Sequence, residues 1–285
     1  MEKHDSVNNI KICKMDDVSE YISHIDCADA DAEFYTAVSE NSEEVYTICD
    51  CDKVVGLSII EDDTEGYLYV YIFSKYRNNG YGYLAACAAE QQMQSSPRLS
   101  ITTAYDANNK IAERFAQKCG FAKTFASSLM RYQGDLFEEK SLPVRKYQDK
   151  DFIDAFTLTA EAFHIMRLGT GCFPNSVMSK PNDEARQLWA DTADERYVYE
   201  LDGEIVGYAH IDGAELDAVA IKTSHQGQGI GREFVKYLTN VIIENRSGEP
   251  FLYCVVGNKK ARQLYGSLGF KEVTCNAYAV KRFEN

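Results

Sequence analysis

Apolar and polar positions in the second half of the chain recur with two periods, one of two residues and one of three to four. Short apolar or alternating runs predict strands, and stripes such as Phe152, Phe156 and Ala160 predict helices. Asp202-Gly203 is a hairpin turn signal between two of the strands. The expected strands are residues 144–147, 197–201, 205–211, 215–221, 251–256 and 278–283, and the expected helices are residues 150–163, 184–190, 229–244 and 259–268. This order predicts an α+β sheet layered with helices.

The same residue pattern occurs twice along the chain. Arg77, Gly80, Gly82, Asn109, Ala112, Gly120 and Phe121 each lie 149 positions before Gln226, Gly229, Gly231, Asn258, Ala261, Gly269 and Phe270. Such an internal repeat indicates two copies of one domain. We expect the copies to span residues 1–140 and 141–285. Each then has the size of a common domain, whose core needs neither disulfides nor metals.

One segment between a predicted strand and a predicted helix is rich in glycine: Gln226, Gly227, Gln228, Gly229, Ile230 and Gly231. A turn of this kind directs backbone N–H groups toward an anion, and glycine allows close approach and positive φ angles. A phosphorylated cofactor is therefore expected. Arg232 occupies the third glycine position of a dinucleotide fingerprint, and no Gly-Lys-Ser/Thr follows for a nucleoside triphosphate loop.

The spacing Q-x-x-G-x-G in this segment resembles the pyrophosphate loop of the GNAT acetyltransferase superfamily. Downstream, residues 258–270 read N-x-x-A-x-x-L-Y-x-x-x-G-F, which is similar to the helix after the fifth strand of those enzymes. The resemblance implies tandem GNAT domains, each a mixed, mostly antiparallel, twisted sheet flanked by helices, and acetyl-CoA (coenzyme A) as the cofactor. The cofactor-binding residues that it implies are Val219, Ala220, Ile221, Gln226, Gly227, Gln228, Gly229, Ile230, Gly231, Asn258 and Tyr265.

Acyl transfer to an amine needs a base and a proton donor. A lysine-like amine has a pKa near 10.4, so its neutral form at pH 7 costs roughly 4.6 kcal/mol. The resemblance implies Glu215 as the base, with Asp217 as the alternative on the same strand face, and Tyr265 as the donor to the leaving thiolate. The other interpretations are an exposed acidic residue at a strand start and a helix tyrosine packed on the sheet.

The first copy lacks both expected catalytic groups, because Ala116 and Gly66 stand where the second copy has Tyr265 and Glu215. Residues 1–140 are therefore expected to be a degenerate copy, and residues 141–285 the catalytic one. The glycine loop and Asn109 remain in the first copy. Two roles stay open for it: unproductive coenzyme A binding, or structural support of the active half.

Composition narrows the class of protein. The chain is 45% hydrophobic and 26% charged, has no apolar run of about 18 residues, and opens without a signal peptide pattern. Nine scattered cysteines without a histidine cluster favour reduced thiols in a cytoplasmic protein with no metal site. A formal charge of −14 argues against a nucleic-acid partner and is compatible with a cationic acceptor.

These observations lead to one functional expectation. We expect an N-acetyltransferase that moves an acetyl group from acetyl-CoA to a primary amine of a small molecule or peptide, by direct attack in a ternary complex. The alternatives are a non-catalytic acyl-CoA-binding or scaffold protein and a transferase of another acyl group. Residues 167–181, irregular and part of an insertion of about 17 residues in the second copy, are expected to be an acceptor loop or a mobile insertion. His210 and His225 are expected to pack in a strand and a loop.

Overall fold

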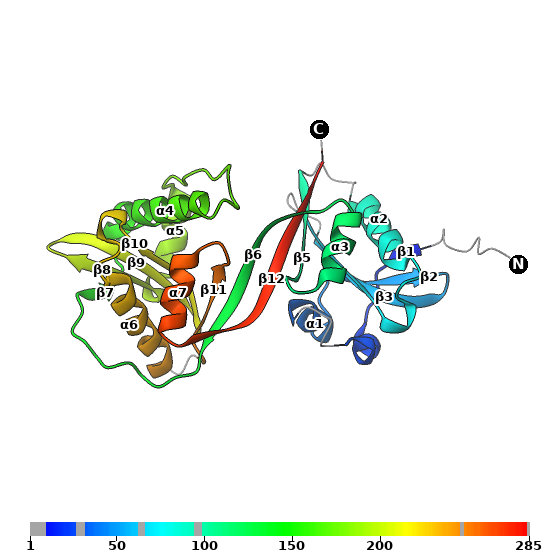
Figure 1. Cartoon of the computed structure of the whole chain (residues 1–285), viewed down its shortest axis with the longest axis horizontal. Helices are drawn as coiled ribbons and strands as arrows, with labels where there is room; N and C mark the ends of the chain where they lie inside the picture. Colours follow the sequence, from blue (N-terminus) through cyan, green and yellow to red (C-terminus); the bar gives the residue numbers. More distant parts are fainter. Residues whose placement is uncertain (1–9, 27–31, 62–65, 94–98, 246–247, 284–285) are drawn as a thin grey trace, which may run out of the picture. The chain divides into compact units, whose positions relative to one another are not determined.

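The computed structural model describes residues 10–26, 32–61, 66–93, 99–245 and 248–283 (Figure 1). The chain divides into two compact units. The first unit is formed by residues 1–124 and 276–285, and the second unit by residues 125–275. Each unit is a sheet with helices packed on it, and antiparallel pairing dominates in both. The predicted α+β fold class is confirmed.

The first unit has a six-stranded sheet in the order β1-β2-β3-β4-β5-β12. Its strands are β1 (Ile10–Cys13), β2 (Val45–Asp50), β3 (Lys53–Glu61), β4 (Tyr67–Ile72), β5 (Ser100–Asp106) and the last part of β12 (Phe270–Arg282). Its helices are α1 (Ala32–Ser39), α2 (Tyr81–Met93) and α3 (Lys110–Lys118). β4 and β5 are parallel, because α2 carries the chain between them.

The second unit has the corresponding order β7-β8-β9-β10-β11-β6. Its strands are β7 (Val144–Lys146), β8 (Arg196–Leu201), β9 (Glu204–Asp212), β10 (Glu215–Ile221), β11 (Phe251–Val255) and most of β6 (Ala122–Tyr132). Its helices are α4 (Phe152–Gly169), α5 (Asp183–Asp191), α6 (Ile230–Glu244) and α7 (Lys259–Ser267). The parallel pair is here β10 and β11, joined through α6.

Each unit takes its last strand from the other half of the sequence. β6 pairs with β11 through Arg131↔Phe251 to Ser127↔Val255. Residues 276–282 of β12 pair with β5 through Asn276↔Asp106 to Arg282↔Ser100. The compact units therefore differ from the repeated sequence segments in their final strand. The division into residues 1–140 and 141–285 concerns the repeat, and it stays a prediction.

Two apolar layers bury the two faces of the second unit's sheet. Phe234, Val235 and Leu238 of α6 are completely buried on one face. On the other face, Trp189 of α5 stacks on Tyr208 of β9 with ring centroids 4.5 Å apart, in a cluster that also holds the start of α4. Helices therefore cover both faces of the sheet. The end of β10 lies between them, because its side chains pack alternately against the two apolar clusters.

Two predicted boundaries were wrong. α4 continues to Gly169, so residues 167–169 are helical where an irregular segment was expected; the helix ends before Gly171, whose φ is 70°. β12 begins at Phe270 and not at residue 278. Its first residues, Lys271 to Val273, are exposed, so the sequence there lacks the apolar alternation by which strands are recognised.

Candidate active site

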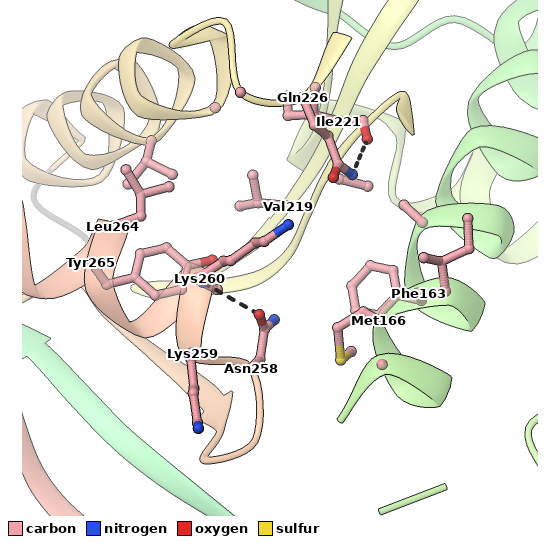
Figure 2. Close-up of a pocket in the computed structure, with 18 of the residues that line it drawn as sticks. Phe163, Met166, Val219, Ile221, Gln226, Asn258, Lys259, Lys260, Leu264 and Tyr265 are labelled. Atoms are coloured by element: carbon pink, nitrogen blue, oxygen red, sulfur yellow. Dashed lines mark hydrogen bonds between the residues drawn. The ribbon is translucent and has the colours of Figure 1, made fainter. Parts of the chain in front are cut away.

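A cavity of about 910 Å³ opens at the end of β10 in the second unit (Figure 2). Four segments line it: the end of β10, the glycine loop, the beginning of α7 and the last turns of α4. Apart from Glu215, eleven site residues were predicted, and nine of them line the cavity: Val219, Ala220, Ile221, Gln226, Gly227, Gly229, Gly231, Asn258 and Tyr265. The other two, Gln228 and Ile230, belong to the same glycine loop. The structure therefore brings the predicted cofactor residues together.

The glycine loop has the backbone that the sequence predicts. Gly227 and Gly229 have φ angles of 77° and 86°, and Gly229 is the N-cap residue of α6. No atom lies within 4 Å of a Cβ built on either glycine, so the peptide planes there are open to a ligand. Gln226 Nε2 donates a hydrogen bond to the Ile221 carbonyl at 3.0 Å and fixes the entry of the loop. The Gln226 N–H donates to the Thr223 carbonyl, and the N–H groups of residues 227–231 have no partner among the described residues. These N–H groups and the helix dipole make the loop suitable for an anion.

β10 and β11 separate where the cavity begins. They pair in register at Glu215↔Phe251, and among the described residues no further pair follows toward Ile221. On its other side β10 stays paired with β9, through Val219↔Ala209 and Ile221↔Gly207. The backbone of residues 219–221 therefore has one edge facing the cavity. Backbone groups of this kind need partners, which an extended amide-bearing ligand would supply.

Asn258 caps α7 as predicted. Its Oδ1 accepts a hydrogen bond from the Ala261 N–H at 3.3 Å, and the side chain lies at the cavity wall (Figure 2). The cap fixes the first turn of α7, and Lys260 and Tyr265 of this helix face the same space.

Tyr265 is half-buried in the cavity wall, with its ring edge against Phe270 at a centroid distance of 5.9 Å. Burial raises the pKa of the Tyr265 hydroxyl well above its ordinary value, and Cys254 adds to the effect. Within the described part of the chain this hydroxyl has no hydrogen-bond partner. At neutral pH it is therefore a protonated O–H that can donate to a ligand in the cavity.

Glu215 and Asp217 lie at the start of β10, outside the lining of this cavity. Burial, followed by the charges of Asp217 and Asp212, raises the pKa of Glu215. A hydrogen bond from His210 is the main cause that lowers the pKa of Asp217. The two candidate bases thus differ: Glu215 is the more basic carboxylate, and Asp217 is held ionised.

The interpretation of His210 as a packing residue missed its partners. Its Nδ1 lies 2.8 Å from Asp217 Oδ2, and its Nε2 lies 3.4 Å from Glu195 Oε2. Asp217 precedes Ala218 at an irregularity in the pairing of β9 with β10, and this irregularity brings Asp217 opposite the histidine. An alternating pattern alone does not locate such an irregularity.

The cavity wall also includes residues that the sequence did not assign to the site, among them Phe163, Met166, Thr170 and Lys260. Phe163 and Met166 lie in the last turns of α4, and Thr170 directly follows the helix. Of these three, only Thr170 lies in the segment 167–181 that was expected to be irregular. Figure 2 shows the Lys260 side chain pointing into the cavity. A cation in the first turn of a helix opposes the helix dipole, and this signal could have marked Lys260.

The described residues contain no group of three or more histidine, cysteine or carboxylate side chains that could hold a metal ion. Within the same ranges, no helix has the length and apolar character that crossing a membrane requires.

Comparison with known proteins gives matches in both halves of the chain. The model of the acetyltransferase (GNAT) family matches residues 11–121 and 163–270. The uncharacterized N-acetyltransferase YobR of Bacillus subtilis is 32% identical over 73 residues, and the match spans 25% of this chain and 30% of that protein's length.

Solved structures of low sequence identity share the fold. A GCN5-related N-acetyltransferase from Sphaerobacter thermophilus has a TM-score of 0.62 at 16% identity, covering 93% of this chain and 89% of the other. A tandem GNAT protein from the clavulanic acid biosynthesis pathway has a TM-score of 0.58 at 11% identity, covering 96% and 98%. Because the family model matches most of the chain and does so twice, this protein belongs to the acetyltransferase (GNAT) family, with two GNAT regions in tandem.

Proposed function

We propose that the second unit binds acetyl-CoA and transfers its acetyl group to a primary amine of a small molecule or peptide. The observation that carries the proposal is the separation of β10 from β11 beside an open glycine loop, with Tyr265 in the same cavity. An anion site, an unpaired strand edge and a proton donor then lie along one cavity. These are the three features that a phosphorylated, amide-containing thioester requires.

The cofactor would lie with its pyrophosphate on the glycine loop of residues 226–231, against the N–H groups of residues 227–231, because the Gln226 N–H is bonded to the Thr223 carbonyl. The pantetheine amides would pair with the backbone of Val219 and Ile221, and Asn258 would bond the same arm while it caps α7. Lys260 adds a positive charge to the cavity wall in a chain whose formal charge is −14. This charge would favour the phosphates of the cofactor over neutral thioesters.

Two side chains handle the two protons that move in the transfer step. The amine nitrogen attacks the thioester carbonyl carbon, the carbon–sulfur bond breaks, and the Tyr265 hydroxyl gives its proton to the departing sulfur. Glu215 accepts the proton that the amine loses, through water because it lies outside the cavity lining. Its raised pKa makes it a stronger base than an ordinary carboxylate, which lowers the cost of that transfer.

A second candidate is a protein that binds acyl-CoA without transferring the acyl group. The position of Glu215 outside the cavity lining supports this candidate, because direct contact with the acceptor is then not shown. The raised pKa of Glu215 and the Tyr265 hydroxyl, which has no hydrogen-bond partner among the described residues, favour the enzyme, since a binding module needs neither. The acidic balance of the chain supports a cationic acceptor, and we retain a cytoplasmic location as part of the proposal.

The test is release of coenzyme A from acetyl-CoA in the presence of a panel of amines, including polyamines, aminoglycosides, amino acids and lysine-containing peptides. Initial rates measured against both substrates should give intersecting double-reciprocal plots, as direct attack in a ternary complex requires. Parallel plots would indicate an acyl-enzyme and contradict direct attack. Tight coenzyme A binding without turnover on any amine would support the binding module, and release with other thioesters alone would assign another acyl group.

A further inference from the structure

The first unit keeps the phosphate loop of the second unit in the same backbone conformation. Asn78 and Gly80 have φ angles of 64° and 83°, close to those of Gly227 and Gly229, which lie 149 positions later. Arg77 Nε donates a hydrogen bond to the Ile72 carbonyl at 2.9 Å. This bond corresponds to the one between Gln226 and Ile221 in the second unit.

The rest of the cofactor frame is also present in the first unit. β4 and β5 pair in register at Tyr67↔Thr102, as β10 and β11 pair at their own start. Asn109 caps α3 by accepting hydrogen bonds from the Ile111 and Ala112 N–H groups at 3.1 and 3.0 Å. A separated strand pair, a capped helix and a left-handed loop therefore recur in the unit that lacks the catalytic groups.

One side chain fills the cleft that this frame would form. Phe115 stands where the second unit has Leu264. A Cβ built on Gly82 would lie 3.1 Å from Phe115 Cε2, so the ring presses on the first turn of α2. A Cβ on the equivalent Gly231 would meet only Ile221, at 3.4 Å, and Gly231 faces the cavity.

The cavity beside Phe115 is too small for the cofactor arm. A cavity of about 70 Å³ is lined by Phe115, and the corresponding cavity of the second unit has about 910 Å³. Its wall includes Ala116, which replaces Tyr265, and none of residues 77–82. Sites for small molecules usually have roughly 300 Å³ or more. Phe115 thus contacts the end of the loop segment at Gly82 and also lines the small cavity, which the loop itself does not reach.

We propose that Phe115 closes a second coenzyme A cleft, so that the protein carries one cofactor site although both units have the frame for one. The inference rests on the proposed function of the second unit as a coenzyme A site. It decides between the two roles that the sequence left open for the first copy, which are coenzyme A binding and structural support. The first unit supports the fold, and its lack of cofactor binding follows from an aromatic plug and not from loss of the phosphate loop.

The test counts equivalents of coenzyme A bound to the full-length protein by calorimetry. The wild type should bind one equivalent, and Phe115→Ala should bind two, the second more weakly. In a Gly229→Val background the expected counts are zero with Phe115 and one with Phe115→Ala. Adding Gly80→Val to that last variant should return the count to zero, because the new site uses the first phosphate loop.

Phe115→Leu places at this position the residue type found in the second copy, and it keeps the test decisive if the alanine variant does not fold. Phe34→Leu is its matched control, because Phe34 is buried in a different cluster of the same unit and should leave the count at one. Two equivalents in the wild type would overturn the inference. So would a single equivalent in Phe115→Ala and Phe115→Leu proteins that melt cooperatively. If Gly229→Val left coenzyme A binding unchanged, that result would contradict the proposed cofactor site in the second unit. The number of equivalents bound by Phe115→Ala would still show whether Phe115 closes the first cleft.

Discussion

His210 Nδ1 lies 2.8 Å from Asp217 Oδ2, and this contact distinguishes two carboxylates that stand two positions apart on β10. The hydrogen bond lowers the pKa of Asp217, whereas burial raises the pKa of Glu215. Asp217 in turn adds to the rise at Glu215, because a fixed negative charge opposes ionisation of its neighbour. The pair therefore contains one carboxylate of raised pKa and one of lowered pKa.

Glu215→Gln should lower kcat/KM most near neutral pH and least at high pH, where the acceptor amine is already neutral. The pKa of Glu215 is raised above its ordinary value of 4.5, and below the raised pKa Glu215 is protonated and cannot act as a base. The wild-type rate should therefore rise as the pH rises through that pKa. The measurement is the pH profile of kcat/KM for both proteins. A variant whose rate stays parallel to wild type at every pH would remove Glu215 as the base.

Asp217→Asn should move the acid limb of the same profile to lower pH. Removing the negative charge of Asp217 takes away a cause of the raised pKa of Glu215, so Glu215 becomes a base at lower pH. Asp212→Asn is the matched control and should shift the limb in the same direction by less, since its charge is the smaller contributor. If Asp217 were itself the base, Asp217→Asn would abolish the rate and shift nothing.

Tyr265→Phe should lower kcat by about 10- to 1000-fold, the lower part of the range for general acids, because a thiolate is a fair leaving group. Affinity for coenzyme A should change little, since the ring and its contact with Phe270 remain. Single-turnover rates and calorimetry together separate the two effects. A loss of affinity that accounts for the whole loss of rate would make Tyr265 a wall residue and not a proton donor.

Local chemistry made much of the site predictable from the sequence. Asp202 and Gly203 have the positive φ angles, 50° and 81°, that their hairpin signal requires, and Asn258 caps α7. These features depend on neighbouring residues alone. The exchange of the final strands could not be predicted, because residues 130–132 and 280–283 have similar patterns and each fits either sheet edge. The closed first cleft also escaped, since Phe and Leu are equivalent in an apolar pattern and only packing distinguishes them.

The exchanged strands predict an energetic coupling between residues 191 positions apart. Lys281 Nζ lies 2.8 and 2.7 Å from the two carboxylate oxygens of Glu90, which is 9% exposed. A double-mutant cycle with Lys281→Met and Glu90→Gln should give a coupling free energy of about 1–2 kcal/mol in thermal or urea unfolding.

The matched cycle for the other strand uses Ser128→Ala and Glu272→Gln, whose side chains bond at 2.6 Å. It should also show coupling, because both residues lie in the second unit. Additive effects in the Lys281–Glu90 cycle would contradict the placement of residues 276–282 in the first unit.

Gly229→Val should abolish coenzyme A binding while the protein still folds, and Gly80→Val should leave binding and turnover nearly intact. The two glycines have φ angles of 86° and 83°, and a Cβ on either meets no atom within 4 Å, so valine adds similar backbone strain to each loop. Strain at such positions costs about 1–3 kcal/mol, so both melting temperatures should fall by similar amounts. The difference between the variants is then steric access, since only Gly229 borders the large cavity. Calorimetry with coenzyme A and differential scanning of both proteins make the comparison. A folded Gly80→Val protein without activity, beside an active Gly229→Val protein, would place the active site in the first unit.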